Sequence, residues 1–130
     1  MSLFKLGEFT LHSGDKSYWK IDCDAFTNED WDTIARMIYE NVGRFKKVIG
    51  VPRGGLKLAK SLQLYCFPNP ENPVLIVDDV LTTGNSMETM RLSIKQDCIG
   101  AVVFARGKYP SWITPLFVAN FKDGINIDVN

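Results

Sequence analysis

Two adjacent carboxylates, Asp78 and Asp79, follow the apolar run Val74–Val77 and precede a loop of small polar residues. A short apolar run bounded by a proline predicts a strand that is buried on both faces of a parallel sheet. The acids come at its end, where their oxygens could bind sugar hydroxyls or a hydrated divalent cation. Ligands of open α/β sheets bind beyond the carboxyl ends of the strands, so both acids are candidate site residues.

The loop after the acids has the features of an anion-binding site. Its glycine permits a positive φ, and successive backbone amides in such a turn can surround an anion. Asn85 or Ser86 could cap the next helix, whose N-terminus also favours an anion. The generic alternative is an acidic turn and a capped helix that bind nothing. The residues predicted to hold a phosphate monoester are Thr82, Thr83, Gly84, Asn85 and Ser86.

A second candidate segment, Pro52–Gly55, follows the predicted strand Lys47–Val51 and opens a helix. Its glycines allow close backbone approach, and Arg53 offers a forked donor to phosphate oxygens. Taken alone, the segment is more often an ordinary turn between a strand and a helix, and its position before the acids is what makes it a candidate.

Alternating strands and helices must position these segments. Apolar spacing predicts a mainly parallel sheet with right-handed crossovers, preceded by a hairpin. Thr27–Asp30 resembles a capping box, and the helix after it places Trp31, Ile34, Ala35, Ile38 and Val42 on one face before Gly43 ends it. The other expected elements are the hairpin Gly7–Cys23, helices Leu56–Cys66 and Ser86–Gln96, a connector Phe67–Pro73, a strand Ile99–Ala105, and a tail with an apolar run Leu116–Phe121 and a turn Lys122–Gly124.

Length and composition predict one soluble domain. The 130 residues suffice for one core, and 15 basic residues balance 15 acidic ones, so no basic field is available for nucleic acid. No apolar run approaches a membrane span, and the N-terminus lacks the long apolar stretch of a signal peptide. Cys23, Cys66 and Cys98 are widely spaced and odd in number, which favours reduced thiols and a cytoplasmic location.

The whole string from Val74 to Ser86 closely resembles the motif with which type I phosphoribosyltransferases bind 5-phosphoribosyl 1-pyrophosphate (PRPP). The N-terminal Phe9-Thr10-Leu11-His12-Ser13-Gly14 string is similar to the hood of the orotate branch. The resemblance covers about residues 6 to 106, and it implies a single phosphoribosyltransferase-like domain over 1–130. Residues 1–24 would form the hood hairpin and residues 25–130 the α/β core.

This resemblance implies transfer of ribose 5-phosphate from PRPP to a nucleobase, most plausibly an orotate-like pyrimidine, with release of pyrophosphate. Asp78, Asp79 and Arg53 would be the catalytic residues, and Arg53, Gly54 and Gly55 would bind pyrophosphate. The segment from Thr82 to Ser86 would hold the 5-phosphate. Mg2+, carried mainly by PRPP, would be the cofactor, with Asp79 as a protein ligand. The implied partners are PRPP, a nucleobase and a second copy in a homodimer, without nucleic acid or membrane.

Two further residues are candidates for contact with the base. His12 stands where the family commonly has a lysine, and Arg106 stands near the place of an arginine that binds the base carboxylate. Each could equally be a surface residue. The segment Lys108–Trp112 could stack on the base or simply pack down its loop.

One family element is missing from the sequence. The family normally has another strand and a long basic lid before the PRPP motif, but only seven residues separate Cys66 from Val74, and none is basic. Lids exclude water and complete the catalytic set, so slow turnover is expected. The alternatives are a non-catalytic PRPP or nucleotide-binding regulator on the same fold, and a purine phosphoribosyltransferase.

Overall fold

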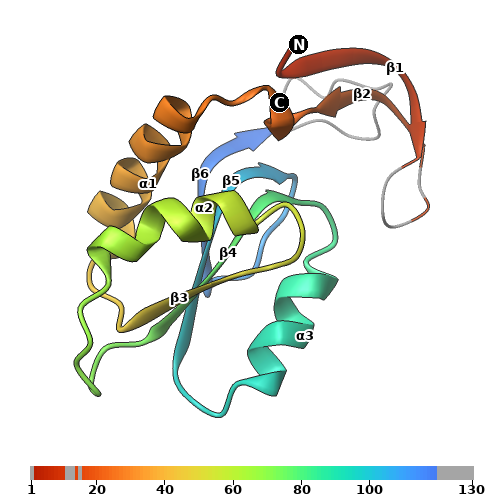
Figure 1. The fold of residues 1–130 in the computed structure, drawn as a ribbon. Coiled ribbons are helices and arrows are strands. Elements are labelled where there is room, and N and C mark those ends of the chain that lie inside the picture. Colours follow the sequence, from red (N-terminus) through yellow and green to blue (C-terminus); the bar gives the residue numbers. More distant parts are fainter. Residues whose placement is uncertain (1, 11–13, 15, 120–130) are drawn as a thin grey trace.

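A four-stranded parallel sheet with helices on both faces forms the core, and a two-stranded antiparallel hood lies beyond one end of it (Figure 1). The computed structural model describes residues 2–10, 14 and 16–119. The hood strands are β1 (Phe4–Thr10) and β2 (Lys16–Ile21), and the core elements are η1 (Cys23–Ala25), α1 (Asn28–Val42), β3 (Lys47–Gly50), α2 (Leu56–Leu62), η2 (Gln63–Tyr65), β4 (Val74–Leu81), α3 (Asn85–Ser93), β5 (Cys98–Arg106) and β6 (Ile113–Ala119).

The sheet order is β3-β4-β5-β6, and every neighbouring pair is parallel. The strands end at different heights. Gly50, the last residue of β3, pairs with Val77, whereas β4 continues beside β5 until Leu81 pairs with Ala105. The predicted mainly parallel sheet is confirmed, and its carboxyl edge is stepped where β3 stops short of β4.

Helices cover both faces of the sheet. Leu75 and Val77 of β4 pack into the core cluster that contains α1 and α2, whereas Ile76 packs into a second cluster with Met87 of α3. Val74 to Val77 are fully buried, which explains why this strand is a continuous apolar run.

The two crossovers that flank β4 have opposite hands. Successive strands β3, β4 and β5 step in one direction across the sheet, yet α2 lies on one face and α3 on the other. The expectation of uniformly right-handed crossovers is therefore wrong for one of them. The reason lies in packing, because the apolar side of α2 (Leu58, Ala59 and Leu62) is buried in the cluster that α1 also covers.

The first long helix forms as its sequence predicts. Thr27 Oγ1 accepts the Asp30 amide at 3.1 Å, and Asp30 Oδ2 accepts the Thr27 amide at 2.8 Å, which completes the capping box. The helix ends at Gly43, whose φ is 78°. On its apolar face four residues are buried (Trp31, Ile34, Ala35 and Ile38), and Val42 packs partly buried against the same core.

Several boundaries differ from the predicted ones. The PRPP-like strand runs on to Leu81, and the following helix spans Asn85–Ser93 rather than 86–96. The helix predicted over 56–66 ends at Leu62 and continues as a 3-10 turn. The tail strand β6 begins at Ile113, earlier than its apolar run suggested; Phe121 and the predicted turn at 122–124 lie outside the described residues.

The hood follows the predicted hairpin, although its first strand begins at Phe4 rather than Gly7. Phe4 joins it to the core through an edge contact with Phe104, whose ring also stacks on Phe26 and Phe117. Within the described residues, no helix is both long and apolar enough to cross a membrane.

Candidate functional site

Both acids lie inside β4 rather than after it, which corrects the predicted position. The strand continues because β5 runs alongside it, pairing Asp78 with Val102 and Val80 with Phe104. The other neighbour, β3, has already ended opposite Val77. The acids are therefore half-buried at the step in the carboxyl edge, where one side of β4 is open to the loop that follows β3.

The backbone holds both carboxyl groups close to the strand. Asp78 Oδ1 accepts the amide of Asp79 at 2.8 Å, and Asp79 Oδ1 accepts the amide of Val80 at 2.7 Å. Burial raises the pKa of Asp78 to about 8, with a further contribution from the neighbouring Asp79 carboxyl. At neutral pH the Asp78 carboxyl group is therefore largely protonated, because burial and a neighbouring carboxyl group both disfavour its charged form.

A buried thiol lies near the acids. Cys23 follows the second hood strand, and burial, followed by the charge of Asp79, raises its pKa to about 12. A thiol with such a pKa stays protonated and unreactive, so Cys23 contributes packing and no negative charge beside the acids.

The turn after β3 packs directly against the acid pair. The amide of Val51 donates to the carbonyl of Val77 at 2.8 Å, which ties the turn to β4. A Cβ added to Gly54 would lie 2.6 Å from Asp79 Cγ, and one added to Gly55 would lie 2.7 Å from the nitrogen of Val51. Gly54 and Gly55 are therefore needed for this close approach, as the sequence predicted.

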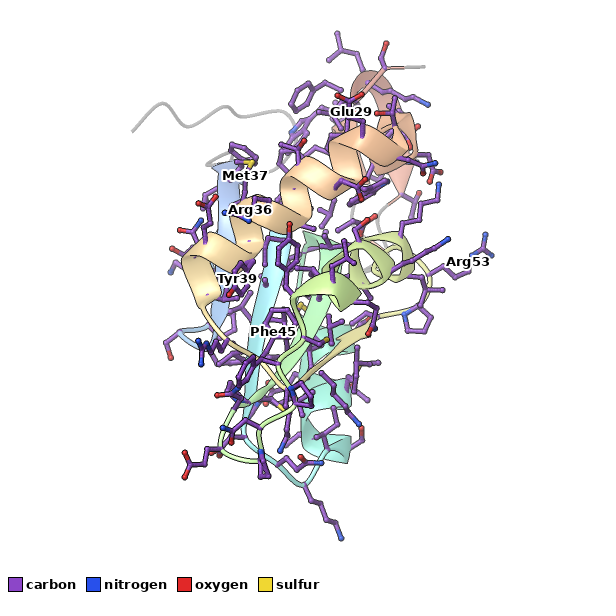
Figure 2. All side chains as sticks on the ribbon, turned by 60° about the vertical axis from the view of Figure 1, so that its left-hand side comes forward. Glu29, Arg36, Met37, Tyr39, Phe45 and Arg53 are labelled. Carbon is purple, nitrogen blue, oxygen red and sulfur yellow. The ribbon has the colours of Figure 1, made fainter. Side chains whose placement is uncertain are left out.

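Arg53 extends from this turn into solvent. Figure 2 shows its side chain projecting away from the ribbon, and the residue is exposed. The peptide that joins it to Pro52 is cis. Among the described residues no carboxylate lies within ion-pair distance of its guanidinium. Its predicted role in binding pyrophosphate stays a prediction, for which the guanidinium is available.

The loop after β4 surrounds a small hollow of about 140 Å³. Gly84 adopts a φ of 83° and is itself the N-cap of α3, without a side-chain cap. The sequence predicted Asn85 or Ser86 as the cap. Neither residue is the cap, because the left-handed Gly84 turns the chain before Asn85. Thr83 Oγ1 accepts the Asn85 amide at 3.3 Å. The hollow is lined by Asp78, Val80, Leu81, Thr82, Thr83, Gly84, Asn85, Ser86 and Met87.

This hollow places all five predicted phosphate-binding residues around one space. The first amides of an α-helix have no partner within the helix, and here they belong to residues that line the hollow. The helix dipole, the first-turn amides that follow Asn85 and the hydroxyls together favour a phosphate group. The phosphate site itself stays a prediction, and the geometry is consistent with it.

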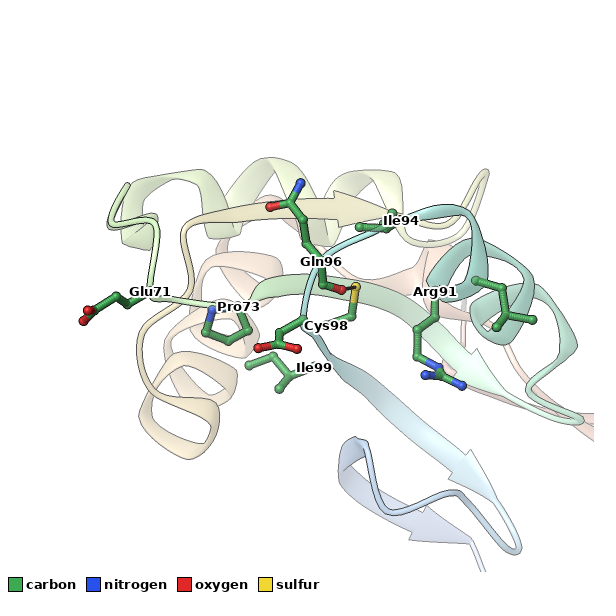
Figure 3. Close-up of a pocket in the computed structure, with 9 residues that line it drawn as sticks. Glu71, Pro73, Arg91, Ile94, Gln96, Cys98 and Ile99 are labelled. Atoms are coloured by element: carbon green, nitrogen blue, oxygen red, sulfur yellow. Dashed lines mark hydrogen bonds between the residues drawn. The ribbon is translucent and has the colours of Figure 1, made fainter.

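A larger cavity of about 610 Å³ lies at the opposite edge of the sheet (Figure 3). It is lined by residues near the start of β5, among them Cys98 and Ile99, and by Arg91 at the end of α3. The guanidinium of Arg91 pairs with Glu88 and lies 5.2 Å from the centre of the Trp112 ring. Size alone therefore does not identify the site, since this cavity is remote from the acids.

Within the segment 108–112, these contacts decide the position of Trp112 alone, and the predicted stacking of the rest of the segment stays a prediction. Trp112 precedes β6 at the amino edge of the sheet, and its ring would lie 2.8 Å from a Cβ on Gly100. It packs down its loop and cannot stack on a base at the carboxyl edge.

Arg106 ends β5 at the carboxyl edge, as predicted, but its guanidinium contacts the hood. It donates to Ser17 Oγ at 2.8 Å and lies 3.5 Å from the centre of the Trp19 ring. Burial lowers its pKa. His12, the other predicted base contact, lies outside the described residues. Contact of either residue with a base stays a prediction.

Sequence reasoning missed Ser17, Trp19 and Cys23 as neighbours of the site. A serine among aromatic residues of a hairpin carries no distinctive pattern, and its contact with Arg106 spans 89 residues of sequence. Only the alternation of β2, which buries Ser17 and Ile21 on one face, could have indicated an inward-facing hydroxyl.

Known structures share this fold, although no protein-family profile and no curated protein sequence matches the chain. Orotate phosphoribosyltransferase from Aeropyrum pernix superposes with a TM-score of 0.71 at 24% identity, covering 89% of this chain and 88% of that one. The Mycobacterium tuberculosis orotate enzyme gives 0.64 at 16% identity, covering 88% and 89%. A Helicobacter pylori xanthine-guanine-hypoxanthine phosphoribosyltransferase gives 0.55 at 18% identity, covering 73% and 86%. The chain thus has the type I phosphoribosyltransferase fold, with the hood included.

Proposed function

We propose that this protein transfers ribose 5-phosphate from PRPP to a nucleobase and releases pyrophosphate, with an orotate-like pyrimidine as the leading base. One observation carries the proposal. The turn 52–55 touches Asp79 through Gly54, while Asp78 also lines the hollow of the loop 82–86. Two segments that are predicted to bind anions, and that are distant in sequence, therefore flank one acid pair. A ribose with a phosphate at one end and a pyrophosphate at the other requires this arrangement.

Each part of the site has a distinct task in this reaction. The loop 82–86 would bind the 5-phosphate through amides and hydroxyls. The carboxyl groups of Asp78 and Asp79 would accept hydrogen bonds from the ribose hydroxyls, and their negative charge would stabilise the cationic sugar that forms as pyrophosphate departs. Arg53 would bind the leaving pyrophosphate, which its exposed guanidinium can follow into solvent.

Magnesium fits this site as a companion of the substrate. Within the described residues no group of three metal-ligating side chains occurs, so that part of the chain offers no metal cage of its own. Mg2+ commonly binds through one or two carboxylates together with substrate phosphates and water, and Asp79 can be such a ligand. When bound, the metal would neutralise charge on the leaving group.

The second candidate is a non-catalytic protein that binds PRPP or a nucleotide. The connector between η2 and β4 favours it, because residues 67–73 carry no basic side chain that could close over pyrophosphate. The proposed preference for orotate rests on the hood and on the orotate enzymes among the similar structures. The assay below therefore also includes purine bases.

The experiment has two measurements on the same preparation. Calorimetry measures binding of PRPP with Mg2+, and a coupled assay measures pyrophosphate release with orotate, uracil, hypoxanthine and guanine. Binding with release for one base supports transfer, binding without release supports the second candidate, and no binding overturns both.

Asp79→Asn tests the site within this experiment. We expect it to weaken PRPP–Mg2+ binding or turnover at least tenfold while the melting temperature stays nearly unchanged, since the amide loses charge but keeps its shape. Asp97→Asn, at the amino edge of the sheet, is the matched control and should bind normally. A collapse of the melting temperature in Asp79→Asn with no specific loss of binding would make Asp79 structural.

A further inference from the structure

The hood contacts the carboxyl end of β5 through one polar side chain that is almost completely buried. Ser17 is 1% exposed, and it is the one polar residue of the described chain that falls in the buried class. A buried hydroxyl is costly unless its hydrogen-bonding positions are filled. The structure fills them from two directions, one local and one from the core.

Within the hood, the Ser17 hydroxyl donates to the Trp19 carbonyl at 2.6 Å and accepts the Trp19 amide at 3.3 Å. A hydroxyl has one donor and two acceptor positions. Nη2 of Arg106 donates to the remaining acceptor position of the hydroxyl at 2.8 Å. Arg106 therefore completes a set that the hairpin cannot complete by itself.

The guanidinium makes a second contact with the same strand. Its carbon lies 3.5 Å from the centre of the Trp19 ring, which is close enough for a cation–π interaction. No carboxylate among the described residues forms an ion pair with it, so the ring and the hydroxyl are the contacts that compensate its burial. Arginine suits this role better than lysine because its planar group can stack and donate at once.

The contact point lies beside the proposed substrate site. Ala105 pairs with Leu81, which directly precedes the phosphate loop, so Arg106 stands one residue beyond that pair. Resting on the proposed function, we propose that Arg106 is a positioning residue that fixes the hood over the carboxyl edge through Ser17 and Trp19, and that it does not serve as a ligand for a carboxylate on the base.

The first test measures hood attachment and needs no substrate. Hydrogen exchange of the β2 amides should accelerate about five- to tenfold in Ser17→Ala and in Arg106→Met, because each removes a hydrogen bond of a buried, charge-assisted pair. The double variant should exchange faster than either single variant but by less than the product of the two effects, since the shared Arg106–Ser17 hydrogen bond is lost only once while each change also removes a contact with Trp19. The exchange rate of the β2 amides in Arg106→Lys should lie between the rates in the parent and in Arg106→Met. Unchanged exchange in both single variants, or additive effects in the double variant, would overturn the proposal.

Arg36→Met is the matched control. Arg36 is an exposed arginine of α1 that pairs with Glu40 one turn away (Figure 2). Its loss should leave the hydrogen exchange of the β2 amides unchanged. If this variant accelerated the hood amides as much as Arg106→Met, the effect would be a general loss of stability and the proposal would fail.

The second test separates positioning from direct contact with the base. In Ser17→Ala and Arg106→Met, KM should rise by similar factors for orotate and for uracil, which lacks the carboxylate. A loss confined to orotate in Arg106→Met, with Ser17→Ala normal, would show a carboxylate ligand and overturn the proposal. If the parent protein has no transferase activity, the proposed function fails, and the exchange measurements still decide whether Arg106 fixes the hood.

Discussion

At the scale of single residues, the site depends on how closely two chain segments approach. Asp79 occupies the space that a side chain at position 54 would need, and its carboxyl group also accepts the amide of Val80. The acid is thus held between its own strand and the neighbouring turn. Such support from surrounding backbone keeps a functional group in one geometry before a ligand arrives.

Gly54→Ala should displace Asp79 and impair PRPP binding. The φ of Gly54 lies outside the left-handed range, so alanine suits the backbone, and the cost comes from collision with the Asp79 carboxyl. We expect a loss of roughly 1–3 kcal/mol in unfolding free energy, as for other overpacked sites. Urea denaturation checks this value. In an Asp79→Ala background the same substitution should cost almost nothing, and an undiminished cost there would contradict the explanation.

Asp78 should make the protein less stable as pH rises. Its pKa is raised to about 8, whereas an unfolded aspartate titrates near 4, so the fold disfavours the ionised form. The contribution of protonated Asp78 to the free energy of unfolding is intact below about pH 4, decreases as pH rises towards about 8 and is then lost. Asp78→Asn keeps the acceptor for the Asp79 amide and removes this dependence. At pH 8.5 we expect the unfolding free energy of Asp78→Asn, measured with urea, to exceed that of the parent by at least about 1 kcal/mol.

Asp97→Asn, an aspartate remote from the pair, is the control for this pH series and should keep the slope of the parent. A slope in Asp78→Asn as steep as that of the parent would show that another group titrates.

At the scale of elements, the end of β4 and the start of α3 together form the hollow that is proposed to bind the 5-phosphate. Asp78 and Leu81 of β4 line this hollow, and the left-handed Gly84 turns the chain so that α3 begins at the next residue. The N-cap Gly84 has no side chain to cap α3, and only the Asn85 amide is bonded to Thr83 Oγ1, so the next amides of the first turn are left for a ligand or for water.

Gly84→Ala should weaken binding of ribose 5-phosphate. A left-handed alanine costs about 1 kcal/mol, so the loop should relax and its amides should no longer converge. Calorimetry with ribose 5-phosphate should show at least a tenfold loss of affinity. Gly43→Ala is a close control, because Gly43 has a φ of 78° at a helix end and open space around it. Gly43→Ala should lose at least as much stability, because the ψ of −153° at Gly43 lies in a region essentially restricted to glycine, and it should keep its affinity for ribose 5-phosphate. If Gly84→Ala bound ribose 5-phosphate as tightly as Gly43→Ala and the parent do, the phosphate site would have to lie elsewhere.

At the scale of the whole molecule, the shortened connection between α2 and β4 shapes the protein. It leaves β3 at the edge of the sheet, and it accompanies the opposite hands of the crossovers on either side of β4. It also leaves Arg53 exposed, with no basic segment after α2 to cover it. The hood is attached to the core through the Phe4–Phe104 contact and the hydrogen bond from Arg106 to Ser17.

Local patterns in the sequence determined much of this protein. The apolar run 74–77, the capping box at Thr27 and the glycines of both loops each depend on neighbours within a few residues, and they predicted the sheet, the first long helix and the placement of both candidate loops. The resemblance of one short string to a PRPP motif predicted the fold of the whole chain.

Tertiary structure decided what depends on contacts between distant segments. The acids lie within β4 because β5 continues beside them while β3 stops. Arg106 contacts the hood because an otherwise unfilled hydroxyl position on Ser17 lies next to it, 89 residues away in the chain. The pKa of Asp78 is raised because folding removes it from water beside a second carboxyl. Strand ends, partners and desolvation are properties of the packed chain, and no local pattern of residue types encodes them.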